Sequence, residues 1–226
     1  MDAERLNKRL VKLGLATSRR KADELIASGQ VSVDGQVCTN LATLVKSSEQ
    51  VTVKGRSGAA KPDIYLAYYK PRGVVCSHRG QGSRTVFDDL PKNFSSLKIG
   101  GRLDKDSEGL MVLTSDGKFI QELTHPSKSK SKTYIVKTKQ ALTAAEIEHI
   151  NKGVKLKDGV SKLKTTALND TTLKIIMSEG RNRQIRRTLE FIGKDVVELQ
   201  RVSIGNYANP RLQKGQYVFI KPEAVL

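Results

Sequence analysis

The feature that most constrains the fold is a charged, glycine-flanked segment that leads directly into an apolar run. Residues 100–109 read Gly-Gly-Arg-Leu-Asp-Lys-Asp-Ser-Glu-Gly, and residues 110–114 read Leu-Met-Val-Leu-Thr. Glycine permits the backbone conformations of tight turns, and a short apolar run bounded by turn signals is typical of a buried strand. The pattern therefore predicts a loop that delivers carboxylates to the edge of a sheet, where functional sites are often built.

One interpretation of this loop is a calcium site. Three acidic residues and a glycine occupy the first, third, fifth and sixth positions of a calcium-binding loop: Asp104, Asp106, Glu108 and Gly109. The twelfth position, where a bidentate glutamate is needed, is Ser115, and the second half of the loop would be an apolar strand. The template therefore fits poorly, and the sequence disfavours a metal ion here.

The charge of the chain indicates a polyanionic partner. Its 226 residues include 40 Lys and Arg against 23 Asp and Glu, a formal net charge of +17. Lys and Arg that contact phosphates release counterions and supply sequence-independent affinity for nucleic acid. A membrane surface is the competing polyanion, but the basic residues are spread along the chain without an amphipathic anchor or a lipidation motif. Nucleic acid is therefore the expected partner.

Several kinds of protein are disfavoured by what the sequence lacks. Residues 1–5 do not form the apolar centre of a signal peptide, and no run approaches the roughly 18 apolar residues of a membrane-spanning helix. Two cysteines are too few for a disulfide framework, and neither they nor the three histidines have metal-ligand spacing. P-loop and dinucleotide-binding motifs are also missing. We expect a cytoplasmic protein that needs no metal and no organic cofactor.

The N-terminal quarter of the chain predicts a small basic domain. Three leucines recur at helical spacing: Leu6, Leu10 and Leu13. A second helix is predicted over residues 19–28, and Asp34-Gly35 between two alternating segments is a hairpin signal. Five basic side chains near these helices are expected to bind RNA phosphates: Arg5, Lys8, Arg19, Arg20 and Lys21. A solvated basic face without a ligand is the alternative.

The rest of the chain reads as a linker and a larger domain. Residues 55–62 have the Gly, Ser, Ala and Pro composition of a flexible linker. The residues after it contain short strands, a few helices and no repeated βαβ period, which indicates an α+β fold with a mixed or antiparallel sheet.

Four motifs occur in order along the larger domain. They are Lys70-Pro71-Arg72-Gly73, Gly101-Arg102-Leu103-Asp104 with Ser107 and Gly109-Leu110, Lys132-Thr133-Tyr134, and Gly180-Arg181-Asn182-Arg183-Gln184-Ile185-Arg186. Together they resemble the pseudouridine synthases that modify ribosomal RNA and carry an N-terminal S4 domain. The resemblance implies an S4 RNA-binding domain over residues 1–54, a linker over 55–62, and a catalytic domain over 63–226 with flanking helices on a mixed, largely antiparallel sheet.

The same resemblance implies roles for individual residues. Asp104 would be the nucleophile that attacks the ribose C1′ or the uracil C6, and the sequence leaves both routes open. Arg186 would hold this carboxylate ionised. Tyr134 would stack on the target base and assist proton removal, although simple core packing is the alternative. Further substrate contacts are expected from Arg102, Leu199, Lys132 and Arg183.

The implied activity is the isomerisation of a uridine in RNA to pseudouridine by a monomer that flips the base out of its stack. The expected partner is RNA, with ribosomal RNA or an assembling ribosomal particle as the first candidate. A non-catalytic RNA-binding or ribosome-assembly protein that retains the fold is the main alternative. A nonspecific cationic RNA chaperone is a third hypothesis, which predicts a steep salt dependence and no site preference.

Overall fold

A computed structural model of the chain describes residues 3–60, 62–125 and 130–226. The chain divides into two compact units, Met1–Asp63 and Ile64–Leu226, and each is described by itself. Residue 61 of the predicted linker lies outside the described residues. Within the described ranges, the helices are too short and too polar to span a lipid bilayer.

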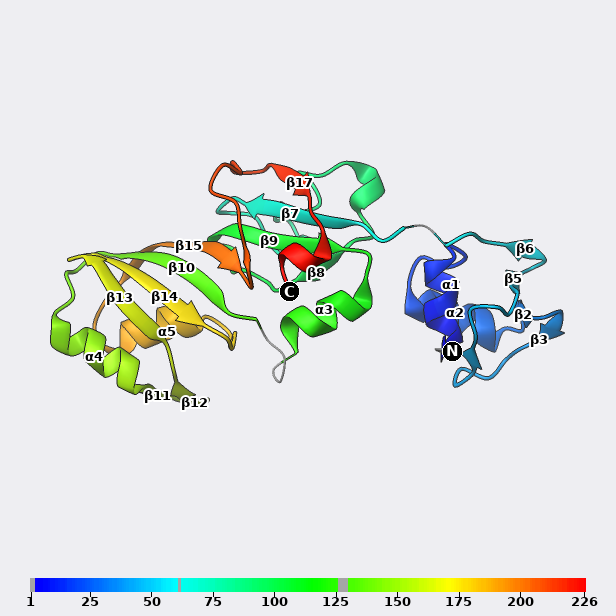
Figure 1. Ribbon diagram of the computed structural model, residues 1–226, viewed down its shortest axis with the longest axis horizontal. Helices are drawn as coiled ribbons and strands as arrows, with labels where there is room; N and C mark the ends of the chain where they lie inside the picture. The colour runs from blue at the N-terminus through cyan, green and yellow to red at the C-terminus, as the bar shows by residue number, and fades with distance from the viewer. Residues whose placement is uncertain (1–2, 61, 126–129) are drawn as a thin grey trace. The chain divides into compact units, whose positions relative to one another are not determined.

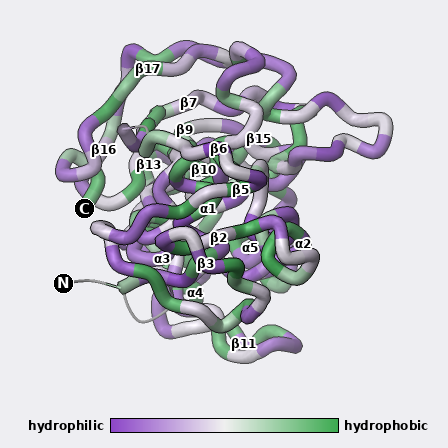
Figure 2. Tube along the Cα trace, turned by 90° about the vertical axis from the view of Figure 1, so that its right-hand side faces the viewer, coloured by the Kyte–Doolittle hydropathy of each residue, from purple (hydrophilic) through white to green (hydrophobic). Residues whose placement is uncertain are grey.

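The first unit is built on two short helices and small antiparallel sheets. Its elements are β1 (Glu4–Arg5), α1 (Leu6–Lys12), α2 (Arg19–Ala27), β2 (Val31–Val33), β3 (Gln36–Val37), β4 (Leu44–Val45), β5 (Val51–Val53) and β6 (Arg56–Ser57). The hydroxyl of Ser18 caps α2 by accepting a hydrogen bond from the Lys21 N–H at 3.1 Å. Polar and apolar stretches succeed one another along α2 (Figure 2), and Ala22 and Ile26 are fully buried against α1.

Two tight turns set the register of the small sheet, whose order is β3-β2-β5-β6. Asp34 and Gly35 both have positive φ values, 47° and 82°, as the predicted hairpin requires. Lys54 and Gly55 repeat this geometry with φ values of 49° and 74°, and β6 therefore folds back onto β5. The predicted linker is corrected by this pairing, because ordered sheet structure continues to Ser57.

The second unit contains a nine-stranded sheet in the described part of the chain, with the order β13-β14-β10-β15-β9-β7-β17 and with β16 and β8 on side branches (Figure 1). Its strands are β7 (Tyr65–Lys70), β8 (Lys98–Gly100), β9 (Glu108–Thr114), β10 (Lys132–Thr138), β13 (Lys164–Asn169), β14 (Thr172–Met177), β15 (Val196–Ile204), β16 (Tyr207–Ala208) and β17 (Tyr217–Phe219). Neighbours are antiparallel except β15 and β9, which are parallel. The predicted mixed, largely antiparallel sheet is confirmed.

Helices flank this sheet, and side chains cap the N-termini of two of them. They are α3 (Gly117–Thr124), α4 (Ala144–Lys152), α5 (Gln184–Phe191) and the 3₁₀ turns η1 (Lys92–Phe94) and η2 (Pro222–Ala224). A separate hairpin is formed by β11 (Val154–Leu156) and β12 (Gly159–Ser161). Asp116 caps α3, and Thr143 and Glu146 form a reciprocal capping box on α4. In Figure 1, α4 and α5 accompany the β13–β14–β10 half of the sheet, and α3 accompanies β8 and β9.

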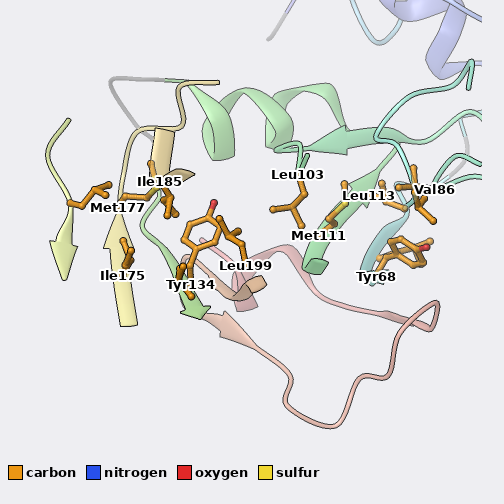
Figure 3. Close-up of a cluster of buried hydrophobic side chains, with 14 of the residues drawn as sticks. Tyr68, Val86, Leu103, Met111, Leu113, Tyr134, Ile175, Met177, Ile185 and Leu199 are labelled. Atoms are coloured by element: carbon orange, nitrogen blue, oxygen red, sulfur yellow. The ribbon is translucent and has the colours of Figure 1, made fainter. Parts of the chain in front are cut away.

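Apolar residues fill both faces of the sheet. One face buries a long cluster that runs from Tyr68 and Val86 to Ile175 and Met177 (Figure 3). The other face packs Leu110 and Val112 against Phe119 and other residues. Because β9 is buried on both faces, the charged loop that precedes it is held at a rigid edge of the core.

Candidate active site

The loop between β8 and β9 carries Asp104 to the mouth of a cleft. The loop turns at Asp104, whose carbonyl accepts a hydrogen bond from the Ser107 N–H at 3.1 Å. The carboxylate remains accessible, with 33% of the side chain exposed. The cleft has a volume of about 370 Å³, within the range of small-molecule sites. Its functional lining includes Asp104, Arg102, Tyr134, Arg183, Arg186 and Leu199.

The inner wall of the cleft is apolar. Tyr134 comes from β10 and is 7% exposed, and Leu199 comes from the neighbouring β15. Figure 3 shows these two side chains close together with Ile185 of α5 beside them. A flat, largely apolar wall that carries one phenolic hydroxyl is suited to an aromatic ring with polar edges.

Two arginines lie on the outer side of Asp104, and they contact Asp106 more closely. Arg183 donates two parallel hydrogen bonds to the Asp106 carboxylate at 3.1 Å each. Its guanidinium lies 3.8 Å from Asp104. Arg183 stands at the start of α5 with a positive φ of 48°.

The predicted partner of Arg186 is corrected by the geometry. Arg186 forms an ion pair with Asp106 at 3.2 Å, and no ion pair between Arg186 and Asp104 is found among the described residues. The guanidinium is held two residues further along the loop, because it also donates to the Asp106 carbonyl at 3.0 Å and the Ser107 hydroxyl at 3.3 Å. Arg186 nevertheless lines the same cleft as Asp104 and contributes its positive charge there.

These contacts shift the titration of the groups involved. Burial raises the pKa of Asp106, but the hydrogen bonds from Arg183 and the charges of both arginines outweigh it, and the pKa of this carboxyl lies below its usual value. Burial lowers the pKa of Arg186, and the nearby carboxylates oppose that effect. Asp106 therefore stays ionised near neutral pH and keeps both guanidinium groups in place.

Of the other residues predicted to contact the substrate, Arg102 lines the cleft and Lys132 does not. Arg102 is exposed at the cleft, whereas Lys132 is only 8% exposed and is absent from the cleft lining. The Lys132 ammonium donates to the carbonyls of Lys130 and Ser178 at 3.2 Å each, which is a structural role at the end of β10. The predicted contact between Lys132 and the substrate is therefore not supported by this geometry.

The five basic residues predicted to bind phosphates lie in the first unit. Arg19, Arg20 and Lys21 are exposed in the first turn of α2. Lys21 pairs with Glu24 at 2.7 Å, and Lys8 pairs with Glu4 at 3.7 Å. Arg5 is exposed on β1. Arg5, Arg19 and Arg20 have no carboxylate at ion-pair distance in the described ranges, so their charges remain available to a polyanion.

The sequence prediction overlooked residues that hold the loop. Lys70 is completely buried, and its ammonium donates to the carbonyls of Pro71 and Val74 at 3.0 and 2.7 Å. The turn formed in this way brings the Gly73 N–H to the Lys105 carbonyl at 2.7 Å. Asp106 and Arg201 were also overlooked. A lysine directly before a proline at the end of an apolar strand is the signal that could have indicated the role of Lys70.

The calcium alternative is contradicted by the position of Glu108. Its carboxylate pairs with Lys214 at 2.8 Å and accepts a hydrogen bond from the Tyr69 hydroxyl at 3.1 Å. Asp106 is held by arginines. Across residues 3–60, 62–125 and 130–226, no three His, Cys, Asp or Glu side chains gather in a group that could hold a metal ion.

Gly109 joins this loop to the sheet at a point where only glycine fits. It has a φ of 115°, and a Cβ atom would lie 2.3 Å from the carbonyl oxygen of Arg201. We expect Gly109→Ala to reduce the free energy of unfolding by about 3 kcal/mol or more, because both backbone strain and overlap are introduced. Urea denaturation followed by circular dichroism measures this loss.

Gly82→Ala is the matched control, since Gly82 has a φ of 84° with no atom within 4 Å of the added Cβ. The control should lose only about 1 kcal/mol, from backbone strain alone. Equal losses in the two variants would contradict the close approach of Gly109 to β15.

Comparison with known proteins assigns this chain to a class of RNA-modifying enzyme. Residues 64–191 match the family model described as RNA pseudouridylate synthase, and residues 4–51 match the S4 domain model. The chain therefore belongs to the RNA pseudouridine synthase family, with an S4 domain at its N-terminal side. The fold and enzyme class expected from the sequence are confirmed.

Individual relatives are similar over most of their length. Ribosomal large subunit pseudouridine synthase B of Bacillus subtilis is 38% identical over 206 residues, which cover 88% of this chain and 84% of the relative. The protein of the same name from Vibrio cholerae is 34% identical, over 96% of this chain and 71% of the relative. A crystal structure of a pseudouridylate synthase superposes with a TM-score of 0.71 at 25% identity, covering 98% of this chain and 99% of the other.

Proposed function

We propose that this pseudouridine synthase acts on a specific uridine of ribosomal RNA and uses Asp104 as its nucleophile. The single observation that carries the assignment is the placement of Asp104. Its accessible carboxylate opens into a cleft that has arginines on one side and an apolar wall with Tyr134 on the other. The names of the relatives support ribosomal RNA as the substrate class.

The reaction breaks the glycosidic bond between C1′ and N1 of uridine and forms a bond between C1′ and C5. The proton on C5 leaves and N1 gains one, so neither water nor electrons are consumed. A carboxylate nucleophile at C1′ or at C6 can hold one fragment while the uracil ring turns. The Asp104 carboxylate supplies this group, and the guanidinium groups of Arg183 and Arg186 line the same cleft.

The wall of the cleft supports a role for two residues in binding the base. Tyr134 and Leu199 present a buried surface on which a uracil ring can stack. Tyr134 lines the cleft, and we assign to its hydroxyl the removal of the C5 proton. Because a stacked uridine cannot reach Asp104, it must be flipped out, at a cost of a few kcal/mol. Arg102, exposed at the cleft, is suited to filling the space that the base leaves.

The purified protein should form pseudouridine when it is incubated with ribosomal RNA transcripts. Chemical mapping of pseudouridine should find one or a few positions, and the same positions should lose the modification in cells that lack the protein. Binding to these RNAs without modification would favour the non-catalytic alternative. Modification of many unrelated RNAs would contradict the proposed specificity. We propose that the protein acts as a monomer in the cytoplasm, and an RNA substrate supports this location.

The basic start of α2 is expected to contribute affinity and not catalysis. Replacing both Arg19 and Arg20 with Gln should weaken RNA binding and reduce the slope of log affinity against log salt by about 2, since each contact releases a counterion. The turnover number at saturating RNA should stay within about twofold. Filter binding at several salt concentrations measures the slope.

The matched control replaces Lys137 and Lys139, two exposed lysines of the second unit, with Gln. It removes the same charge and should leave the slope unchanged. Equal slopes in the two double variants would contradict direct phosphate contacts by Arg19 and Arg20. The charge of the S4 domain would then act only through its long-range electrostatic attraction.

A further inference from the structure

Arg201 is a buried arginine for which the preceding mechanism has no use. It is 1% exposed, and it lies in β15 directly opposite Tyr134 of β10. No carboxylate lies within ion-pair distance of its guanidinium in the part of the chain that the structure describes. Burying a cation without a countercharge is costly unless its hydrogen bonds are well satisfied. Its position in the centre of the sheet therefore calls for a specific set of acceptors.

The acceptors are backbone carbonyls on both sides of Asp104. The Arg201 Nε donates to the Leu110 carbonyl at 2.7 Å, and one terminal nitrogen donates to the Gly101 carbonyl at 3.0 Å. The other terminal nitrogen lies 3.5 Å from the Arg102 carbonyl. Guanidinium donors point in fixed directions within one plane, so this side chain sets the separation and orientation of the backbone segments that it joins.

The backbone of Arg201 fastens the same loop a second time. Arg201 pairs with Gly109 in the parallel pairing between β15 and β9. The absence of a Cβ on Gly109 allows the two backbones to approach closely. Arg201 thus holds both ends of the segment from Gly101 to Gly109. Its side chain binds the start of the segment, and the backbone of Arg201 pairs with the end.

We propose that Arg201 is a positioning residue, which orients the Asp104 carboxylate into the cleft by clamping the two ends of the loop that carries it. The inference rests on the proposed role of Asp104 as the nucleophile. Among the described residues, the Asp104 carboxylate has Arg183 as its ion-pair partner at 3.8 Å, so its direction depends chiefly on the backbone of the loop. A misplacement of about 1 Å at a reacting atom can reduce a rate by about 10²-fold.

The test compares Arg201→Lys and Arg201→Met with the unaltered protein. Both variants should lose about 10²-fold in kcat, while KM and RNA affinity stay within about twofold. Lysine retains the charge but cannot reach the three carbonyls together, so a role in geometry predicts that it does not rescue the rate. Hydrogen exchange of the amides in residues 101–107 should become faster in both variants, with exchange in β13 and β14 unchanged.

A stability control separates this effect from simple weakening of the fold. Leu173→Ala removes a fully buried side chain from β14 and should lower Tm while leaving kcat unchanged at a temperature well below Tm. In Arg201→Ala, added guanidinium ion should restore part of the lost rate, and ammonium at equal ionic strength should not. Variants of Arg201 that keep kcat within threefold, or full rescue by lysine, would overturn the inference.

These experiments distinguish failure of the positioning role of Arg201 from failure of the proposed function. If the unaltered protein modifies RNA and the Arg201 variants do so equally well, only the inference fails. If the unaltered protein modifies no RNA, the proposed function fails, and the exchange comparison still decides whether Arg201 clamps the loop. Unchanged exchange over residues 101–107 in Arg201→Met would then contradict the clamp.

Discussion

Asp104→Asn should lose at least about 10⁴-fold in kcat for pseudouridine formation, because an amide cannot act as the nucleophile. The side chain is one-third exposed, and the substitution keeps its shape, so folding should be unaffected. RNA affinity should be equal or slightly higher, since one negative charge near the phosphates is removed. Single-turnover assays at saturating RNA, together with filter binding, measure the two effects separately.

Asp170→Asn is the matched control, because it removes the same charge at an exposed turn between β13 and β14. It should retain the full rate. An Asp104→Asn variant that keeps more than about 1% of the rate would exclude Asp104 as the nucleophile, whatever the fate of the control.

Arg186→Met should reduce kcat by about 10²- to 10³-fold, because it removes a largely buried cation from the cleft. Arg186 is 10% exposed and is held by Asp106, Ser107 and the Val196 carbonyl. Arg187→Met is a matched control on the same helix. Arg187 pairs with Asp158 at 2.8 Å and does not line the cleft, and its replacement should keep the rate within threefold.

The pH dependence of Arg186→Met provides a second measurement. Arg183 and Arg186 keep the pKa of Asp106 below its usual value, so the stability that Asp106 contributes is present above its unfolded pKa and is lost as the pH falls through its folded pKa. Without Arg186, the folded pKa moves toward the unfolded one and this contribution shrinks. The loss of stability relative to the unaltered protein should therefore be larger at neutral pH than at acidic pH. Urea denaturation at pH 7 and at pH 3 measures the difference, and equal losses at the two pH values would contradict the ion pair.

Local signals in the sequence predicted much of the fold. The turn at Asp34-Gly35 depends on interactions within a few residues and is visible as a short pattern. The second turn, at Lys54-Gly55, was missed because lysine rarely adopts a positive φ and the following residues have the composition of a linker. Strand order was also outside the reach of local patterns.

The site was predicted by motif, and its detailed contacts were not. Asp104, Tyr134, Leu199 and Arg186 do line one cleft. The pairing of Arg186 with Asp106 depends on how α5 and the loop meet, which residue spacing cannot specify. Lys132 was assigned to the substrate by resemblance, whereas its position on an inward face of β10 buries it. An arginine on the inward face of a strand, such as Arg201, indicates a buried cation that binds neighbouring backbone.

The central place of β15 in the sheet has a consequence for the order in which this protein can fold during its own synthesis. The strands β7 and β9 and the strands β10, β13 and β14 are synthesised first, yet they are joined only through β15, which contains residues 196–204. A nascent chain that ends before this strand leaves one edge of β10 and the first residues of β9 without a partner, and unpaired edges are sites for intermolecular pairing. The last quarter of translation is therefore the interval in which this chain should depend most on chaperones.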